Sequence, residues 1–248
     1  MKDFMLEVCV DSVESAVAAQ NGGALRLELC SNLIIGGTTP TPALFRAVRE
    51  AVDIKIHVLI RPRFGDFCYT DAEFQIIREE VRQFRSLGAD GVVIGILCPD
   101  GSLNIEQMES LIEEAKGMQI TVHRAFDVCR DPMQTLEECI SLGAHTILTS
   151  GQEANCLAGA ELLRKLKTVA NGRIHILGGA GVSAANLEEL CLVTGLNQFH
   201  MSGKKVLDSS MEYHREGVPM GLPGISEFSI WQTDEEEIRK AAEVLERV

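Results

Sequence analysis

Aromatic side chains are scarce in this sequence. Phe, Trp and Tyr together make up 5% of its 248 residues, with a single Trp among them. Aliphatic side chains must therefore fill the core, which suits a parallel sheet covered on both faces by helices. The composition, with 46% hydrophobic and 24% charged residues, is that of a globular chain able to bury a large core.

Positive charge is also in deficit. The chain has 23 Lys and Arg residues against 36 Asp and Glu residues, which gives a net charge of −13. Such a field repels nucleic acid and anionic lipid, and no apolar run approaches the roughly 20 residues that cross a membrane. We therefore expect neither nucleic acid nor a membrane as a partner. A local basic pocket remains compatible with a small anion.

The eight cysteines include no C-x-x-C pair, which argues against a structural zinc site. They are widely spaced in a long chain, unlike the disulfide framework of a small secreted domain. The first residues also lack a signal-peptide pattern, because Glu7 and Asp11 interrupt a short apolar stretch. These features predict a cytoplasmic protein.

Short apolar runs alternate with amphipathic, helix-like stretches along the chain. Eight strands alternating with helices at this length predict an α/β fold, a single-domain (β/α)8 TIM-type barrel over residues 1–248. A doubly wound open sheet is the alternative, but residues 11–14 (DSVE) do not form the Gly-rich turn that usually follows its first strand. The expected strands are 5–10, 24–30, 55–61, 91–97, 119–126, 145–150, 174–178 and 197–202.

One segment, residues 203–232, departs from this alternation. It separates the last expected strand from the last helix, and it contains a Gly- and Pro-rich stretch at 217–224 and the single Trp231. We expect a long loop on the carboxy-terminal face of the barrel. Such a loop would either fold over the site or pack on a partner subunit.

The first two strands each carry a Glu-x-Cys pair. Side chains alternate across a strand, so Glu7 and Cys9 share one face of the first strand, and Glu28 and Cys30 share one face of the second. We expect both pairs to point into the barrel. Two thiols there could hold Cu(I), which prefers soft ligands. The other interpretation is that both cysteines are simply small buried hydrophobes, which from spacing alone is the commoner outcome.

Ionisable residues gather where the third and fifth strands end. Arg61 and Arg63 suit a carboxylate or phosphate ligand, or else an internal ion pair. His123, Arg124 and Asp127 follow the fifth strand; His123 could serve as a general acid or base, with Asp127 orienting a partner or accepting a proton. The alternative is a satisfied polar network that closes the mouth of the barrel.

Small residues mark the ends of the last three strands. Ser150 precedes a glycine, Gly178 and Gly179 end the seventh strand, and Ser202 ends the eighth. Barrels that bind phosphorylated ligands often use backbone N–H groups at these positions. Helix caps or ordinary turns are the competing interpretations.

Several longer motifs extend over most of the chain: LEVCVDSVESA (6–16), RLELCSN (26–32), GGTTPT (36–41), IRPRFGDFCYTDAE (60–73), HRAFDVCRDP (123–132), LTSGQ (148–152) and GGAGV (178–182). Together these motifs resemble the CutC copper-homeostasis family over nearly the whole chain. The resemblance implies a (β/α)8-type barrel, a cytoplasmic location, often a homodimer, an association with copper tolerance and no established reaction. It also implies Cu(I) binding at Cys9 and Cys30. Phe64 departs from the Gly that many members have. Family motif positions are matched by Glu7, Glu28, Arg61, Arg63, Asp66, His123, Arg124 and Asp127.

Three hypotheses follow. The first is a copper-handling protein that binds Cu(I) through Cys9 and Cys30, assisted by Met201 or a loop cysteine, with no organic cofactor. The second is a metabolic enzyme for a small anionic or phosphorylated substrate. The third is a scaffold that assembles through residues 203–232. For the enzyme, the predicted catalytic residues are Glu7, Glu28, His123 and Asp127, and the predicted ligand-binding residues are Arg61, Arg63, Arg124, Ser150, Gly178, Gly179 and Ser202.

Overall fold

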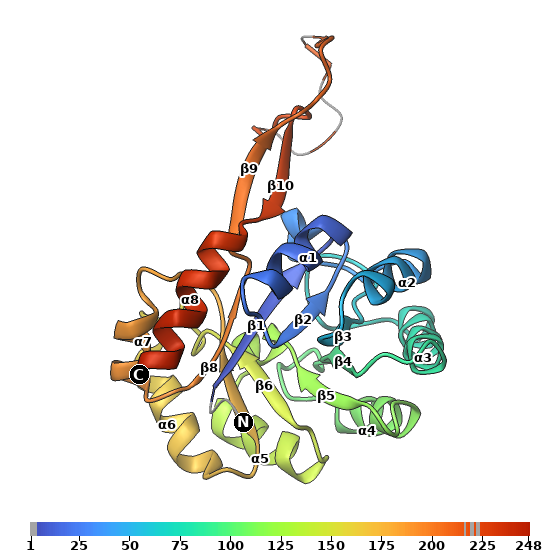
Figure 1. Cartoon of the computed structure of the whole chain (residues 1–248). Helices are drawn as coiled ribbons and strands as arrows, with labels where there is room; N and C mark the ends of the chain where they lie inside the picture. Colours follow the sequence, from blue (N-terminus) through green and yellow to red (C-terminus); the bar gives the residue numbers. More distant parts are fainter. Residues whose placement is uncertain (1–3, 216, 219–220, 222–223) are drawn as a thin grey trace.

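Eight parallel strands, β1 to β8, close into one barrel in sequence order (Figure 1), which confirms the predicted (β/α)8 fold. The computed structural model describes residues 4–215, 217–218, 221 and 224–248. The barrel strands are β1 (Met5–Val10), β2 (Arg26–Leu29), β3 (Lys55–Leu59), β4 (Gly91–Ile94), β5 (Gln119–Val122), β6 (Thr146–Thr149), β7 (His175–Gly178) and β8 (Gln198–Met201).

Helices surround the barrel and follow its strands in turn. Local sequence sets several of their starts: Thr70 and Glu73 form a capping box, and Pro42 and Pro132 occupy first-turn positions, where a missing N–H costs little. The α-helices are α1 (Val13–Asn21), α2 (Pro42–Ala51), α3 (Asp71–Ser86), α4 (Ile105–Glu114), α5 (Pro132–Ser141), α6 (Ala160–Ala170), α7 (Leu187–Thr194) and α8 (Glu235–Arg247), and the 3-10 helices are η1 (Leu33–Ile35) and η2 (Arg124–Val128).

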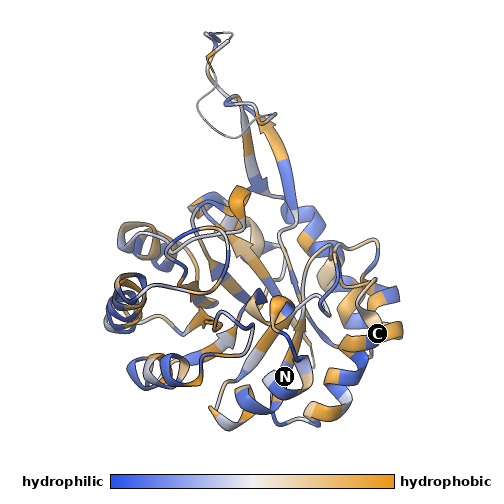
Figure 2. Cartoon of the chain, turned by 180° about the vertical axis from the view of Figure 1, so that it is seen from behind, coloured by the Kyte–Doolittle hydropathy of each residue, from blue (hydrophilic) through white to orange (hydrophobic). Residues whose placement is uncertain are grey.

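Two apolar clusters lie on opposite faces of the barrel strands. Val8 and Leu29 belong to the large core between strands and helices. Cys9, Cys30 and Val93 belong to a separate, smaller cluster. This division follows the two-residue period of a strand. In Figure 2 the barrel strands are largely in the hydrophobic colour, and the helices carry both colours.

The segment expected as one long loop contains two further strands. β9 (Lys204–Asp208) and β10 (Ser229–Thr233) pair antiparallel and form an arm that projects from the barrel (Figure 1). The arm extends outward, so it does not fold over the barrel mouth. The Gly- and Pro-rich stretch at 217–224 lies partly outside the described residues. Among the helices that the structure describes, none is long and apolar enough to cross a membrane.

Candidate functional site

A cavity of about 310 Å³ opens at the carboxy-terminal ends of the barrel strands. Residues at or just after the ends of β1, β2, β3, β5, β6, β7 and β8 contribute to its walls. The position is the one where barrels of this class carry their sites. Of the residues singled out in the sequence, the cavity is lined by Cys9, Glu28, Arg61, His123, Arg124, Met201 and Ser202.

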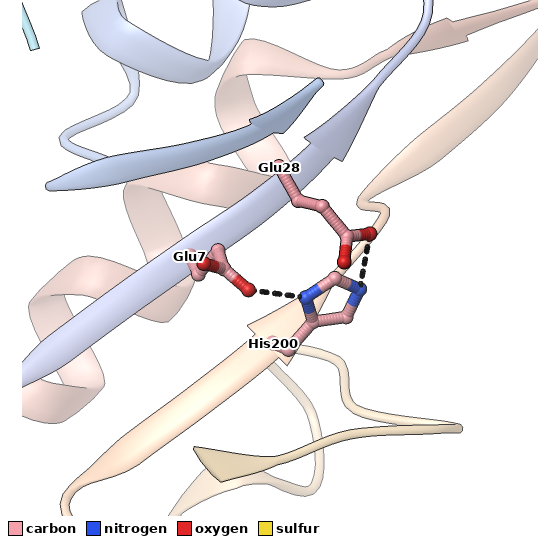
Figure 3. A group of neighbouring side chains, drawn as sticks. All are labelled: Glu7, Glu28 and His200. Atoms are coloured by element: carbon pink, nitrogen blue, oxygen red, sulfur yellow. Dashed lines mark hydrogen bonds and ion pairs between the residues drawn. The ribbon is translucent and has the colours of Figure 1, made fainter. Parts of the chain in front are cut away.

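A chain of buried charged groups occupies the β1, β2 and β8 side of the barrel interior (Figure 3). Arg26 donates from Nε to Glu7 Oε2 at 2.5 Å. His200 Nδ1 lies 2.8 Å from the other oxygen of Glu7, and His200 Nε2 lies 3.9 Å from Glu28 Oε2. The strand register brings these side chains together, because Glu7 on β1 pairs with Arg26 on β2 and with His200 on β8.

These neighbouring buried groups shift one another's pKa values. Burial opposes ionisation of Glu7, but Arg26 and His200 outweigh it and hold the pKa of Glu7 well below its usual range. Burial would lower the pKa of His200, yet Cys9, Glu28 and Glu7 raise that pKa well above 6.5. Burial raises the pKa of Glu28, and the Glu7 carboxylate adds to the effect. Of the two carboxyl groups, Glu7 therefore stays ionised and Glu28 takes up a proton more readily.

The two cysteines lie on adjacent strands but differ in access. Cys9 is 9% exposed and lines the cavity, and its thiol donates weakly to the carbonyl of Met201 at 3.7 Å. Cys30 is fully buried, and its thiol donates to Glu28 Oε2 at 3.4 Å. Burial and the neighbouring Glu28 raise the pKa of Cys30 well above its usual value. Cys9 thus faces the cavity, with Cys30 behind it.

Met201 does not offer its thioether to these cysteines. Its side chain belongs to the core between strands and helices, and its methyl group lies beside Gly203, close to Ile238 of α8. The residue one position earlier, His200, takes the inward direction instead. The packing of Met201 in this core does not favour its expected assistance to Cys9 and Cys30.

Arg61 lies on the opposite side of the cavity, where β3 ends. Its guanidinium is buried and donates to three backbone carbonyls, those of Gly36 and Gly37 at 3.2 and 3.1 Å and that of Gly65 at 2.8 Å. Arg61 makes no ion pair within the described part of the chain, so the ion-pair alternative applies to Arg63, which pairs with Asp66, and not to Arg61. Arg61 instead packs 5.0 Å from the centre of the Phe67 ring.

His123 borders the same side of the cavity. Its Nδ1 accepts the backbone N–H of Ala125 at 3.2 Å, and its ring lies 4.7 Å from that of Phe67. Burial, together with the charge of Arg61, lowers the pKa of His123 to about 3. His123 is therefore a neutral imidazole near neutral pH.

Three other predicted residues lie outside the cavity wall. Arg63 pairs with Glu73 at 2.5 Å and with Asp66 at 3.0 Å. Asp127 accepts hydrogen bonds from Arg124, Thr149 and Ser150, which ties η2 to the end of β6. Ser150 is itself fully buried in these contacts. Asp127 and Ser150 therefore join η2 to the end of β6 at the mouth of the barrel.

The glycines after β7 serve packing within the barrel. The N–H of Gly179 donates to the carbonyl of Thr149 at 2.9 Å, so it is already used by the sheet. A Cβ at Gly179 would lie 2.5 Å from Leu148, and one at Gly178 would lie 3.2 Å from Phe199. The cavity is lined here by the next residues instead, Ala180, Gly181 and Val182.

The sequence did not single out His200 or Arg26 as site residues. Alternation along the eighth strand could have identified His200, since it faces opposite to Phe199 and Met201. Its contact with Glu7 depends on closure of β8 onto β1, which has no local signal.

The CutC family matches residues 4–205 of the chain. This protein belongs to the CutC family. A CutC family protein of Bacteroides fragilis is 42% identical over all of this chain and 98% of its own length. The human copper homeostasis protein cutC homolog is 42% identical over 95% of this chain and 87% of its own length.

Solved structures agree with this assignment. A CutC structure from Streptococcus agalactiae superposes with a TM-score of 0.76 at 31% identity, covering 80% of this chain and 98% of that one. Thiamine phosphate pyrophosphorylase from Pyrococcus furiosus has a TM-score of 0.57 at 18% identity, covering 99% and 97%. At that identity the second likeness concerns the fold alone.

Proposed function

We propose that this protein acts in copper homeostasis by binding Cu(I) at the barrel mouth through Cys9 and Cys30. The observation that carries the proposal is the meeting of both thiols in one buried cluster, with Cys9 at the cavity wall. Thiolates are the ligands that Cu(I) prefers. Relatives that carry the name copper homeostasis protein support the same function.

The surroundings of Cys30 suit a thiol that ionises only when a cation arrives. Without metal, burial and Glu28 raise its pKa and keep it protonated. A bound Cu(I) would supply the missing positive charge, as metals do for coordinating thiols. Entry would be through the cavity, past Cys9.

Cu(I) titration of the reduced full-length protein against a competing chelator tests the proposal. We expect the double variant Cys9→Ser with Cys30→Ser to lose at least about 100-fold in affinity, since it removes both soft ligands. Cys68→Ser and Cys98→Ser are matched controls, because these thiols are only partly buried and lie outside the cluster. Equal affinity in the double variant and the wild type would exclude these thiols as ligands.

A second candidate function is catalysis on a small anionic substrate. The supporting observation is the buried chain of Arg26, Glu7, His200 and Glu28, which two-thiol copper binding does not require. Within it, Glu28 lines the cavity and is the group best positioned for proton transfer. Turnover of a phosphorylated metabolite that is lost in Glu28→Gln would support an enzyme. A screen without turnover would leave this candidate without support.

We also propose a homodimer in a reducing compartment. The arm of β9 and β10 exposes Val206 and Ile230, and a lone two-stranded sheet is marginally stable in water. All eight cysteines are free thiols, which fits the cytoplasm. Light scattering should give twice the chain mass for the intact protein, and the monomer mass after Val206→Asp with Ile230→Asp if the arm forms the interface.

A further inference from the structure

Arg61 is a buried cation without a counter-ion. Arg61 is only 8% exposed, and the three hydrogen bonds of its guanidinium all go to neutral backbone carbonyls. The Nε–H has no hydrogen-bond acceptor in the described part of the chain, and the neighbouring Tyr69 hydroxyl stays neutral because burial raises its pKa to about 12. The nearby acid Asp66 pairs with Arg63 instead. Burying a charge without a partner is costly. The unpaired guanidinium of Arg61 therefore favours the binding of an anion that is not part of the chain.

His123 adds an unused donor next to this cation. Because its Nδ1 accepts the Ala125 N–H, the ring proton must be on Nε2. That nitrogen is buried and has no acceptor among the residues described. The ring is also fixed in place, because a Cβ on Gly95 would lie only 2.6 Å from its Cε1. His123 is therefore a fixed, neutral N–H donor.

The two groups converge on one place. Both line the same cavity, and both pack on the ring of Phe67, at 5.0 Å from the Arg61 guanidinium carbon and 4.7 Å from the His123 ring. A cation and an N–H donor that lack acceptors are complementary to an oxygen-bearing anion. A metal ion does not fit here, since Arg61 would repel it and the free nitrogen of His123 carries a proton.

We propose that Arg61 and His123 form a binding site for the carboxylate or phosphate group of a small molecule held in the cavity. Arg61 supplies the charge, and His123 donates a hydrogen bond to one oxygen of the same group. Arg124, which is half-exposed and lines the cavity, lies at the rim, where it pairs with Asp127 at 2.6 Å. A cavity of about 310 Å³ limits the ligand to a small metabolite.

The site is separate from the proposed copper ligands. Cys9 and Cys30 lie on β1 and just after β2, whereas Arg61 and His123 follow β3 and β5. The proposal needs neither copper binding nor turnover, although it names the substrate class if the protein is an enzyme. Failure of one proposal leaves the other standing: Cys9→Ser with Cys30→Ser should retain anion binding, and Arg61→Met should retain Cu(I) binding.

The experiment measures binding of inorganic phosphate and of malonate to the full-length protein by calorimetry, at constant ionic strength with chloride as the background anion. We expect saturable binding of at least one probe, and the tighter probe distinguishes a phosphate from a carboxylate ligand. Arg61→Met should weaken it by at least about tenfold, since it removes the buried positive charge that would pair with the anion. His123→Phe should weaken it by about three- to tenfold through loss of one donor.

Arg49→Met is the matched control. Like Arg61, Arg49 donates to backbone carbonyls, in its case those of Val52 and Ile54, but it also pairs with Asp90 and does not line the cavity. The Arg49→Met variant should bind phosphate and malonate as tightly as the wild type does. If Arg61→Met does not fold, Arg61→Lys, which keeps the charge but loses the planar fork, is compared with His123→Phe. Absence of binding in the wild type, or equal losses in the Arg49 and Arg61 variants, would overturn the proposal.

Discussion

The two sides of the cavity satisfy their charged groups in opposite ways. On the side of β1, β2 and β8, the Glu7 carboxylate pairs with both Arg26 and His200, while Arg26 Nη2 has no hydrogen-bond partner in the described chain. On the side of β3 and β5, the guanidinium of Arg61 donates only to backbone carbonyls, and the Nε2–H of His123 has no acceptor in the described chain. The ion-paired side should contribute mainly to stability. The side that lacks a carboxylate for Arg61 should contribute mainly to binding.

Glu7→Gln should have the largest effect on stability. It leaves Arg26 without its carboxylate in the barrel interior, which typically costs about 3–5 kcal/mol. Urea unfolding followed by circular dichroism measures the change. Glu73→Gln is the control, because its pair with Arg63 is partly exposed and should contribute less than about 1 kcal/mol. Similar losses in the two variants would contradict a stabilising role for the buried pair.

Stability should decrease as the pH falls below about 6.5. Burial, aided by Arg26, lowers the pKa of His57 to about 4, so the unfolded chain takes up this proton first and is favoured between those two pH values. The loss attributable to His57 is about 3 kcal/mol, complete near pH 4.

Urea unfolding at a series of pH values measures this slope. His57→Gln should reduce it, while His145→Gln, which replaces an exposed histidine, should leave it unchanged. A slope in His57→Gln as steep as that of the wild type would show that His57 is not the group responsible.

Gly95→Ala should weaken anion binding without touching the ligand. The added methyl group would lie 2.7 Å from His123 Nδ1 and displace the ring, so phosphate or malonate affinity should fall by about five- to tenfold. Gly88→Ala controls for stability alone, because its left-handed backbone is strained by a side chain but its Cβ meets nothing. Unchanged affinity in Gly95→Ala would argue against His123 as a donor.

The smallest expected effect is in the pH dependence of anion binding. Because His123 is neutral and Arg61 stays charged, affinity for sulfate should change by less than about twofold between about pH 5.5 and 8.5. A cationic His123 would instead strengthen binding as the pH falls through the ordinary histidine range. Calorimetric titrations with sulfate across this range measure the difference, and binding that tightens in acid would assign the charge to His123.

Much of the site followed from local patterns. The two Glu-x-Cys pairs could be assigned to one strand face because strands alternate with a period of two. The strand-end residues Arg61 and His123 could be placed at the mouth because parallel strands of a barrel end together. Arg63, two residues after Arg61 in the same motif, looked equally suitable, yet it pairs with Glu73 outside the cavity.

By itself, the sequence determined the barrel, its polar mouth and the membership of the CutC family. Alternating apolar runs, helix caps and turns depend on residues that are close in the sequence, so they can be recognised from the sequence alone. Only the tertiary structure decided which groups meet. Glu7 and His200 are 193 residues apart and touch because β8 closes on β1. Arg26 likewise meets Glu7, 19 residues away, because β1 pairs with β2. Pairing of charges depends on register and closure, which link distant segments and leave no local trace.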